Sequence, residues 1–297
     1  MKTILITGAT QGLGLQVVKY LALKQDVNII IAVRNIDKGN EIASSLGNNV
    51  SVVKLDLSSF KNIKEFITNW NVKIDGLINN AGVQFTSKNS FTSDGFEETI
   101  AVNHLAAFLL TIGLEKHLKN GRVLFIGSGT HNPNHSVARM FGFRGAQYTS
   151  IKELSEGLGN TSDIVQLNLD RYATSKLLNT ITAVELSRRY NTFSSFVLDP
   201  GLMPGTGLAR NQNGIMKFLW QFFMPLIGIF LPDTSSSKRS GRTASWIMTE
   251  EYLPFKSGEI ISYNKKLSVH VWNEIVLNEK IGKEVYEDSM SLVRPYL

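Results

Sequence analysis

Thr7-Gly8-Ala9-Thr10-Gln11-Gly12-Leu13-Gly14 is the stretch of sequence that decides the fold. It follows the apolar run Thr3–Thr7 and opens a stretch with helical periodicity, so it predicts a turn between a strand and a helix. Glycines at such a turn let the backbone approach a bound group closely, and the helix N-terminus offers free N–H groups and positive partial charge. These features favour a phosphate-bearing cofactor, although a glycine turn after a strand can also be purely structural.

Short apolar runs and helix-like stretches alternate along the rest of the chain. The runs are mostly continuous Ile, Val and Leu, which is typical of strands buried on both faces of a parallel sheet. Seven strands are predicted, at Thr3–Thr7, Asn28–Val33, Val50–Leu55, Ile74–Asn79, Arg122–Gly127, Phe193–Leu198 and Glu259–Tyr263. Helices are predicted at Gly12–Lys24, Phe60–Trp70, Gly95–Leu118 and Asp170–Tyr190. The alternation predicts an α/β fold, a single Rossmann-type doubly wound domain over residues 1–297 with a seven-stranded parallel sheet.

Two long connections interrupt this alternation, near residues 129–161 and 205–240. Connections that follow the strands of an open parallel sheet lie at its carboxyl edge, where such folds bind ligands, so we expect both to shape the substrate site. The second contains the apolar segment Ile215–Leu231, which polar residues, a proline and a glycine interrupt. These interruptions favour an amphipathic or broken helix over a membrane-spanning one, and its role as a substrate lid, an interface or a peripheral membrane contact stays open.

The composition narrows the chemistry. Hydrophobic residues make up 43% of the 297 residues and charged residues 19%, as in a globular protein. The chain has no cysteine, which excludes disulfides, iron–sulfur clusters and thiol nucleophiles and is compatible with a reducing compartment. Because the N-terminal sequence reads as a first strand and not as a signal peptide, we expect a cytoplasmic protein.

The distribution of charge and the spacing of the histidines indicate which ligands the chain binds. The net charge of +6 comes without a long basic run, so we expect no nucleic-acid partner and a small substrate instead. His131 and His135 are close in sequence, but Pro133 lies between them and no third ligand is evident, so we expect no metal site. The sequence leaves the oligomeric state open.

The residue after the second predicted strand indicates the cofactor. An NAD-binding enzyme places an acidic residue there to bind the ribose 2′-hydroxyl, but this chain has Arg34. Arg34 and Lys38, one helical turn later, offer positive charge suited to a 2′-phosphate. The sequence therefore predicts NADP(H), with NAD(H) as the alternative. An ordinary solvated pair at a helix start is the structural alternative.

Tyr172 and Lys176 are candidates for acid–base chemistry. Residues four apart share one face of a helix, so the Lys176 ammonium can lie near the Tyr172 phenol. A phenol has a pKa of about 10, and a nearby cation lowers that pKa toward the range useful for proton transfer. Asn103, inside a predicted helix, and Ser128, after the fifth predicted strand, complete the candidate catalytic set.

The glycine-rich turn, Asn79-Asn80-Ala81-Gly82 and this catalytic set, in this order, resemble the short-chain dehydrogenase/reductase family. The resemblance implies that Tyr172 donates or accepts the proton, Lys176 also holds the nicotinamide ribose, Ser128 bonds the substrate oxygen and Asn103 supports a proton relay. The implied cofactor contacts are Thr7, Gly8, Thr10, Gln11, Gly12, Leu13, Gly14, Arg34, Lys38, Asp56, Leu57, Asn80, Ala81, Gly82, Tyr172, Lys176, Pro200, Gly201 and Thr206. Asp56 can instead cap the next helix.

Further stretches look like the retinol dehydrogenase and protochlorophyllide reductase branch of that family, namely Asp94-Gly95-Phe96-Glu97, Val102-Asn103-His104-Leu105 and Thr206-Gly207-Leu208. The protochlorophyllide enzymes place cysteines near their pigment, and this chain has none, which argues against light-driven reduction. The resemblance implies an NADP(H)-dependent oxidoreductase that acts on an apolar carbonyl or alcohol. A catalytically silent NADP-binding sensor or scaffold is the alternative, which the intact catalytic set disfavours.

Overall fold

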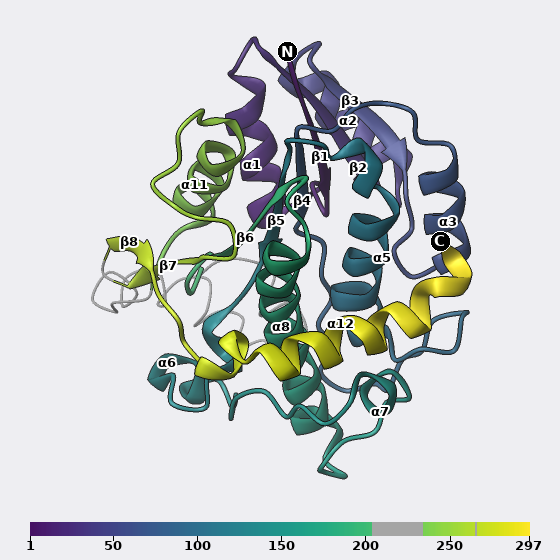
Figure 1. The fold of residues 1–297 in the computed structure, drawn as a ribbon, viewed down its shortest axis with the longest axis vertical. Helices are drawn as coiled ribbons and strands as arrows, with labels where there is room; N and C mark the ends of the chain where they lie inside the picture. Colours follow the sequence, from purple (N-terminus) through teal and green to yellow (C-terminus); the bar gives the residue numbers. More distant parts are fainter. Residues whose placement is uncertain (204–233, 265) are drawn as a thin grey trace.

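The computed structural model describes residues 1–203, 234–264 and 266–297 (Figure 1). In these ranges one sheet has the strand order β3-β2-β1-β4-β5-β6-β7-β8. Its strands are β1 Lys2–Thr7, β2 Val27–Val33, β3 Val50–Lys54, β4 Gly76–Asn79, β5 Arg122–Ile126, β6 Ser194–Asp199, β7 Ile260–Asn264 and β8 Lys266–Val269. The longer helices are α1 Gly12–Ala22, α2 Ile36–Leu46, α3 Phe60–Thr68, α5 Ala106–Gly113, α8 Ile164–Arg189, α11 Ser237–Thr249 and α12 Glu279–Val293.

Each of the seven predicted strands is present, and the predicted α/β fold class is confirmed. Strands β1 to β7 pair in parallel, whereas β8 runs antiparallel to β7. The prediction of seven strands is corrected by β8. Its sequence Lys-Leu-Ser-Val has no continuous apolar run, because it is a half-exposed edge strand and not one buried on both faces.

Helices cover both faces of the sheet, and each face has its own core. Buried residues of α1, α2 and α11 pack with β1 and β2 on one side. Buried residues of α3, α5, α8 and α12 pack on the other side, where α12 lies across α8 and α5 (Figure 1). Because both faces are covered, the strands need apolar side chains in both directions. This explains the continuous Ile, Val and Leu runs in the sequence.

Helix boundaries differ from the prediction in several places. The helix that carries Tyr172 begins at Ile164 and not at Asp170, because the side chain of Asp163 accepts a hydrogen bond from the backbone N–H of Val165 (2.9 Å) and caps it. The predicted helix Gly95–Leu118 is divided into α4 Glu98–Ile100, a π-helical turn, α5 and a 3₁₀ turn. The sequence prediction gave no bounds for α2, although it placed Arg34 and Lys38 at a helix start, and it gave none for α11 or α12.

The connection near residues 129–161 contains a 3₁₀ turn and two short helices, α6 Ser136–Met140 and α7 Ile151–Ser155. Most of the connection near residues 205–240 lies outside the described residues, including Thr206 and the apolar segment Ile215–Leu231. The predicted lid, interface or membrane contact of that segment therefore stays a prediction. Among the described helices, none is long and apolar enough to cross a bilayer.

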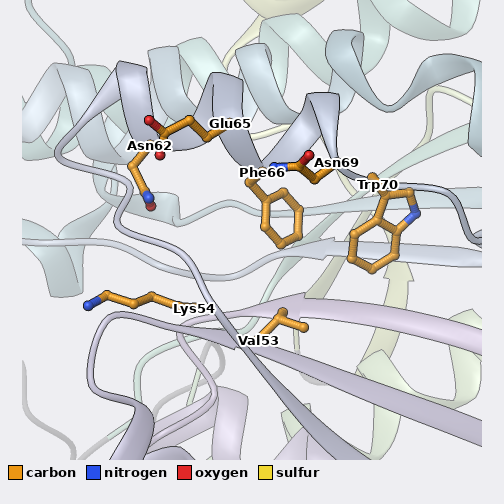
Figure 2. A pocket seen from close by; sticks show the side chains of 7 residues that line it. All are labelled: Val53, Lys54, Asn62, Glu65, Phe66, Asn69 and Trp70. Carbon is orange, nitrogen blue, oxygen red and sulfur yellow. The ribbon is translucent and has the colours of Figure 1, made fainter.

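A groove of about 340 Å³ lies between the edge strand β3 and helix α3 (Figure 2). It is lined by Val53, Lys54, Asn62, Glu65, Phe66, Asn69 and Trp70. The rings of Phe66 and Trp70 lie side by side at 5.1 Å between centroids. No predicted site residue lines this groove, so the candidate site has to be sought at the carboxyl edge of the sheet.

Candidate active site

The glycine-rich turn after β1 is fastened to the turn after β4. The side-chain amide of Asn80 donates to the backbone carbonyls of Thr7 and Gly8, both at 2.9 Å. Gly8 has a φ of +69°, which a side chain would strain, and a Cβ on Gly14 would lie 2.3 Å from the Gly8 carbonyl oxygen. Strand order reverses between β1 and β4, and open α/β sheets bind their ligands at such a point.

Helix α1 begins without a side-chain cap. Gln11 occupies its N-cap position and forms no capping hydrogen bond. By contrast, a side chain caps the N-terminus of each other long described helix that does not continue from a preceding helical turn. These helices are α2, α3, α8, α11 and α12. Gly12, at the start of α1, has a φ of +57°, and a Cβ there would meet nothing within 4 Å. Open N–H groups beside open space fit a phosphate of a dinucleotide, which would satisfy them in place of a cap.

The residues expected at the adenosine end lie at the same edge of the sheet. Arg34 and Lys38 are exposed, and neither side chain has a hydrogen bond or ion pair within the described part of the chain. Asp56 does not cap α3, since Ser59 does so by accepting from the backbone N–H of Asn62. Oδ1 of Asp56 instead accepts from the backbone N–H (3.0 Å) and hydroxyl (2.7 Å) of Ser58. The other oxygen of Asp56 has no hydrogen bond within the described part of the chain.

Asn103 lies in the π-helical turn Ala101–Leu105 and links the segment after β4 to α8. Its Oδ1 accepts from the backbone N–H of Val83 (2.7 Å), and its Nδ2 donates to the Val83 carbonyl (3.0 Å) and to the hydroxyl of Ser175 (3.0 Å). A Cβ on Gly82 would lie 3.3 Å from Oδ1 of Asn103 and 3.8 Å from Nζ of Lys176. The structure therefore brings Asn103, Gly82 and Lys176 together.

Lys176 is buried, and its Nζ donates to the carbonyl of Ile126 at the end of β5 (3.0 Å). Burial lowers the pKa of Lys176 to about 8, and the Asp199 carboxylate partly opposes this shift. Nζ lies 5.7 Å from the centre of the Tyr172 ring. The two side chains thus share one face of α8, as their spacing predicts.

The expected shift of the Tyr172 pKa is wrong for this structure. Burial, with the negative charge of Asp199, raises the pKa of Tyr172 to about 12, and Lys176 does not reverse this. The sequence prediction considered the cation alone and could not include the low-dielectric surroundings. At neutral pH the phenol is therefore protonated and suited to donate a proton.

Ser128 follows β5 and begins the connection near residues 129–161. Its hydroxyl oxygen accepts from the backbone N–H (3.3 Å) and hydroxyl (3.1 Å) of Thr130. Both contacts use Ser128 as the acceptor, so its own O–H is available to donate to a substrate oxygen. The same connection brings Phe141 and Phe143 to an apolar cluster with Tyr172, whose ring lies 6.0 Å from that of Phe143.

The chain is similar to known proteins. The family model described as short chain dehydrogenase matches residues 2–142. The chain is 32% identical over 285 residues to the chloroplastic protochlorophyllide reductase of Pisum sativum, across 88% of this chain and 69% of that protein. It is also 32% identical to the chloroplastic protochlorophyllide reductase B of Hordeum vulgare, across 97% of this chain and 78% of that one. The chain belongs to the short-chain dehydrogenase/reductase family.

Within that family it is a member of the protochlorophyllide reductase-like branch, so the resemblance predicted from the motifs is confirmed. Solved structures share its fold. An uncharacterized protein of Mycobacterium paratuberculosis matches with a TM-score of 0.74 and 23% identity over 99% of this chain and 94% of that one. Salutaridine reductase from Papaver somniferum matches with a TM-score of 0.58 and 17% identity over 88% of this chain and 99% of that one.

The comparison corrects one expectation from sequence. The relatives named above are chloroplastic, which contradicts the expected cytoplasmic location. The expectation rested on an N-terminus without an evident signal peptide and on the absence of cysteine, and neither feature distinguishes one reducing compartment from another.

Sequence reasoning on this short-chain dehydrogenase/reductase missed three polar residues of the site. Ser175 bonds Asn103, and Asn179 donates through Nδ2 to the Asn103 carbonyl (2.9 Å). Asn179 follows Lys176 by one helical turn, so helical periodicity alone could have identified it. Asp199 has no place in the predicted site, although it follows a predicted strand and lies at the end of β6, at the carboxyl edge of the sheet.

The turn after β6 closes the candidate site on the nicotinamide side that the family implies. Gly201 has a φ of +70°, and its backbone N–H donates to Oδ1 of Asp199 (3.0 Å). The hydroxyl of Ser240 donates to the Pro200 carbonyl (2.8 Å) and fixes the turn to α11. Thr206, the remaining expected contact, lies outside the described residues.

The two histidines of the substrate-side connection are buried near this edge. Burial lowers the pKa of His131 to about 4. Nδ1 of His135 accepts from the backbone N–H of Ala138 (3.2 Å) and caps α6. Among the described residues, no group of three or more potential metal ligands is present.

Proposed function

We propose that this chain is an NADPH-dependent reductase that transfers hydride to an apolar carbonyl compound, with Tyr172 as the proton donor. The observation that carries the proposal is the place of Lys176, which shares a helical face with Tyr172 and bonds the carbonyl of Ile126, two residues before Ser128. Asn103 bonds Ser175 of the same helix, and these residues lie at the same sheet edge as the uncapped N-terminus of α1. The exposed Arg34 supports NADPH over NADH, because its guanidinium is available for a 2′-phosphate.

Each of the three side chains Tyr172, Lys176 and Ser128 has a separate role in the proposed reduction. The bound nicotinamide would supply the hydride that reaches the carbonyl carbon. Tyr172 gives its proton to the carbonyl oxygen, which becomes a hydroxyl, and the charge of Lys176 stabilises the phenolate left behind. Ser128 can donate a hydrogen bond to the same oxygen. A pKa of about 12 keeps Tyr172 protonated at neutral pH, as its role as proton donor requires.

An apolar substrate is favoured by the side chains around Tyr172. Phe141, Phe143 and Leu169 cluster against its ring, and the first two come from the connection near residues 129–161. Such surroundings stabilise a substrate by excluding water from its apolar surface.

Two variants test this function, one on helix α8 and one at the residue that ends it. Oxidation of NADPH is followed with a panel of aldehydes, ketones, steroids and quinones. Tyr172→Phe removes the proton donor but keeps the ring, so turnover should fall by about 10²- to 10⁴-fold while NADPH affinity stays within about twofold. Tyr190→Phe is the matched control: it removes the hydroxyl that bonds Tyr286 (2.9 Å) at the far end of the helix, and it should keep parental turnover. Parental turnover in Tyr172→Phe would contradict the assignment.

A second candidate is reduction of a protochlorophyllide-like pigment, and the names of the relatives favour it. Protochlorophyllide is therefore added to the panel, with assays in light and in darkness. Turnover of the pigment alone would replace the carbonyl proposal. NADPH binding without turnover of any compound would instead favour the catalytically silent sensor.

A further inference from the structure

Asp199 is a buried carboxylate to which this mechanism gives no role. It is the last residue of β6 and exposes 4% of its surface. The backbone N–H of Gly201 bonds one of its oxygens (3.0 Å). Burying a charge is unfavourable unless opposite charge or hydrogen bonds compensate it, so its surroundings show what it interacts with.

The Asp199 carboxylate and the carbonyl that holds the Lys176 ammonium lie at the ends of two adjacent strands, β6 and β5. Lys176 donates to the carbonyl of Ile126, and Ile126 pairs with Leu198, the residue before Asp199. The second oxygen of Asp199 lies 3.3 Å from the position that a Cβ of Gly129 would take, three residues beyond the end of β5. The carboxylate therefore lies beside the end of β5 that holds the ammonium.

We propose that Asp199 is a positioning residue that keeps the Lys176 ammonium charged and the Tyr172 phenol protonated, and so sets the site for proton donation in the reduction direction. The proposal rests on the function proposed above. An anion stabilises a neighbouring cation and destabilises a second anion. One carboxylate therefore favours both the charged form of Lys176 and the neutral form of Tyr172.

The electrostatics of the two groups agree with this geometry. Asp199 opposes the burial that lowers the pKa of Lys176 to about 8, and it adds to the burial that raises the pKa of Tyr172 to about 12. Without Asp199, Lys176 would lose its proton closer to neutral pH, and the site would lose the cation that stabilises the phenolate. His135 is a second titratable group in this region, because its Nε2 lies 2.7 Å from the same Cβ position of Gly129.

The test measures the titration of Lys176 directly and needs no substrate. The chain is labelled with ¹³C-lysine, and the Lys176 signal is identified by its loss in Lys176→Met. Asp199→Asn keeps an acceptor for the Gly201 N–H but removes the charge, so the midpoint of the Lys176 titration should fall by about one pH unit. Asp75→Asn is the matched control, since Asp75 begins the turn into β4 at the amino edge of the sheet, and it should leave the midpoint unchanged.

Two further variants guard against misfolding of Asp199→Asn and against an effect of the neighbouring imidazole. Asp199→Ser also removes the charge and replaces the Asn variant if that variant does not fold, whereas His135→Asn shows how much of the shift the imidazole contributes. Parental midpoints in both charge-removing variants would overturn the proposal. A midpoint that falls equally in His135→Asn would assign the effect to the imidazole and would also overturn it. Because these readings use no substrate, their failure is distinct from a failure of the proposed reduction, which the Tyr172→Phe turnover reports.

Discussion

The Arg34→Ala variant gives the sharpest measure of cofactor choice. Arg34 is exposed and has no hydrogen bond or ion pair within the described ranges, so its loss should leave the free energy of unfolding unchanged. Its whole effect should therefore be seen in cofactor binding. A charge-assisted hydrogen bond to a phosphate contributes about 1.5–3 kcal/mol, which corresponds to about 10- to 100-fold in affinity.

NADPH and NADH differ at the 2′-position alone, which makes them a matched pair of ligands. We expect Kd for NADPH to rise about 10- to 100-fold in Arg34→Ala and Kd for NADH to stay within about twofold, as measured by the fluorescence of the bound nicotinamide. The loss should shrink at high salt, because screening weakens the parental interaction. Lys24→Ala is the control, since it removes one exposed positive charge just beyond α1, away from the glycine-rich turn.

Two results would refute this reasoning. Equal weakening of NADPH and NADH would show that Arg34 supports the site without reading the 2′-phosphate. Parental affinity for both would show that the 2′-phosphate is bound elsewhere, and Lys38→Ala would then be the next variant.

Two further predictions concern the turn and the buried histidines. Gly14→Ala places a Cβ 2.3 Å from the Gly8 carbonyl oxygen, so the turn must shift, and NADPH affinity should fall at least about tenfold; affinity within twofold of the parent would show that the turn tolerates the shift. Burial lowers the pKa of His104 and of His131 from 6.5 to about 4, so the unfolded chain binds protons first as pH falls. Their contribution to stability is complete above pH 6.5 and is lost between pH 6.5 and 4, at most about 3 kcal/mol for each histidine. Urea unfolding at pH 7.5 and pH 5 measures this loss, and a double His→Asn variant with the same pH dependence as the parent would contradict it.

The sequence predicted those parts of the site that depend on local patterns. The turn from Thr7 to Gly14 follows from strand, glycine and helix signals within a few residues, and the shared face of Tyr172 and Lys176 follows from helical geometry. The π-helical turn at Asn103 could not be predicted, because it depends on contacts with Val83 and Ser175, which are distant in sequence.

Tertiary context also explains the remaining errors. Burial sets the pKa of Tyr172, and burial depends on the packing of Phe143 and its neighbours and not on the helix itself. β8 was missed because an edge strand needs apolar residues on one side at most. Both errors arise where the surroundings outweigh local preference.

Burial of the Lys176 ammonium costs folding stability but places the charge that the proposed reaction needs, and this cost can be measured. Burial lowers its pKa from 10.5 to about 8, so the folded protein holds the ammonium less readily than the unfolded chain does. Below pH 8 the charged side chain therefore destabilises the fold by about 3 kcal/mol, and this cost is relieved as pH rises from 8 to 10.5, because the unfolded chain then binds more protons.

Lys176→Met removes the charge and keeps a long side chain, although it gives up the bond to the Ile126 carbonyl. We expect the variant to be more stable to unfolding than the parent by about 1–3 kcal/mol at pH 7. It should also bind NADPH more weakly and show no turnover. Urea unfolding of both proteins from pH 7 to 10.5 should show the stability difference shrinking. A variant less stable than the parent at pH 7 would mean that Ile126 and Asp199 compensate the buried charge fully, so that Lys176 stabilises the fold as well as the phenolate.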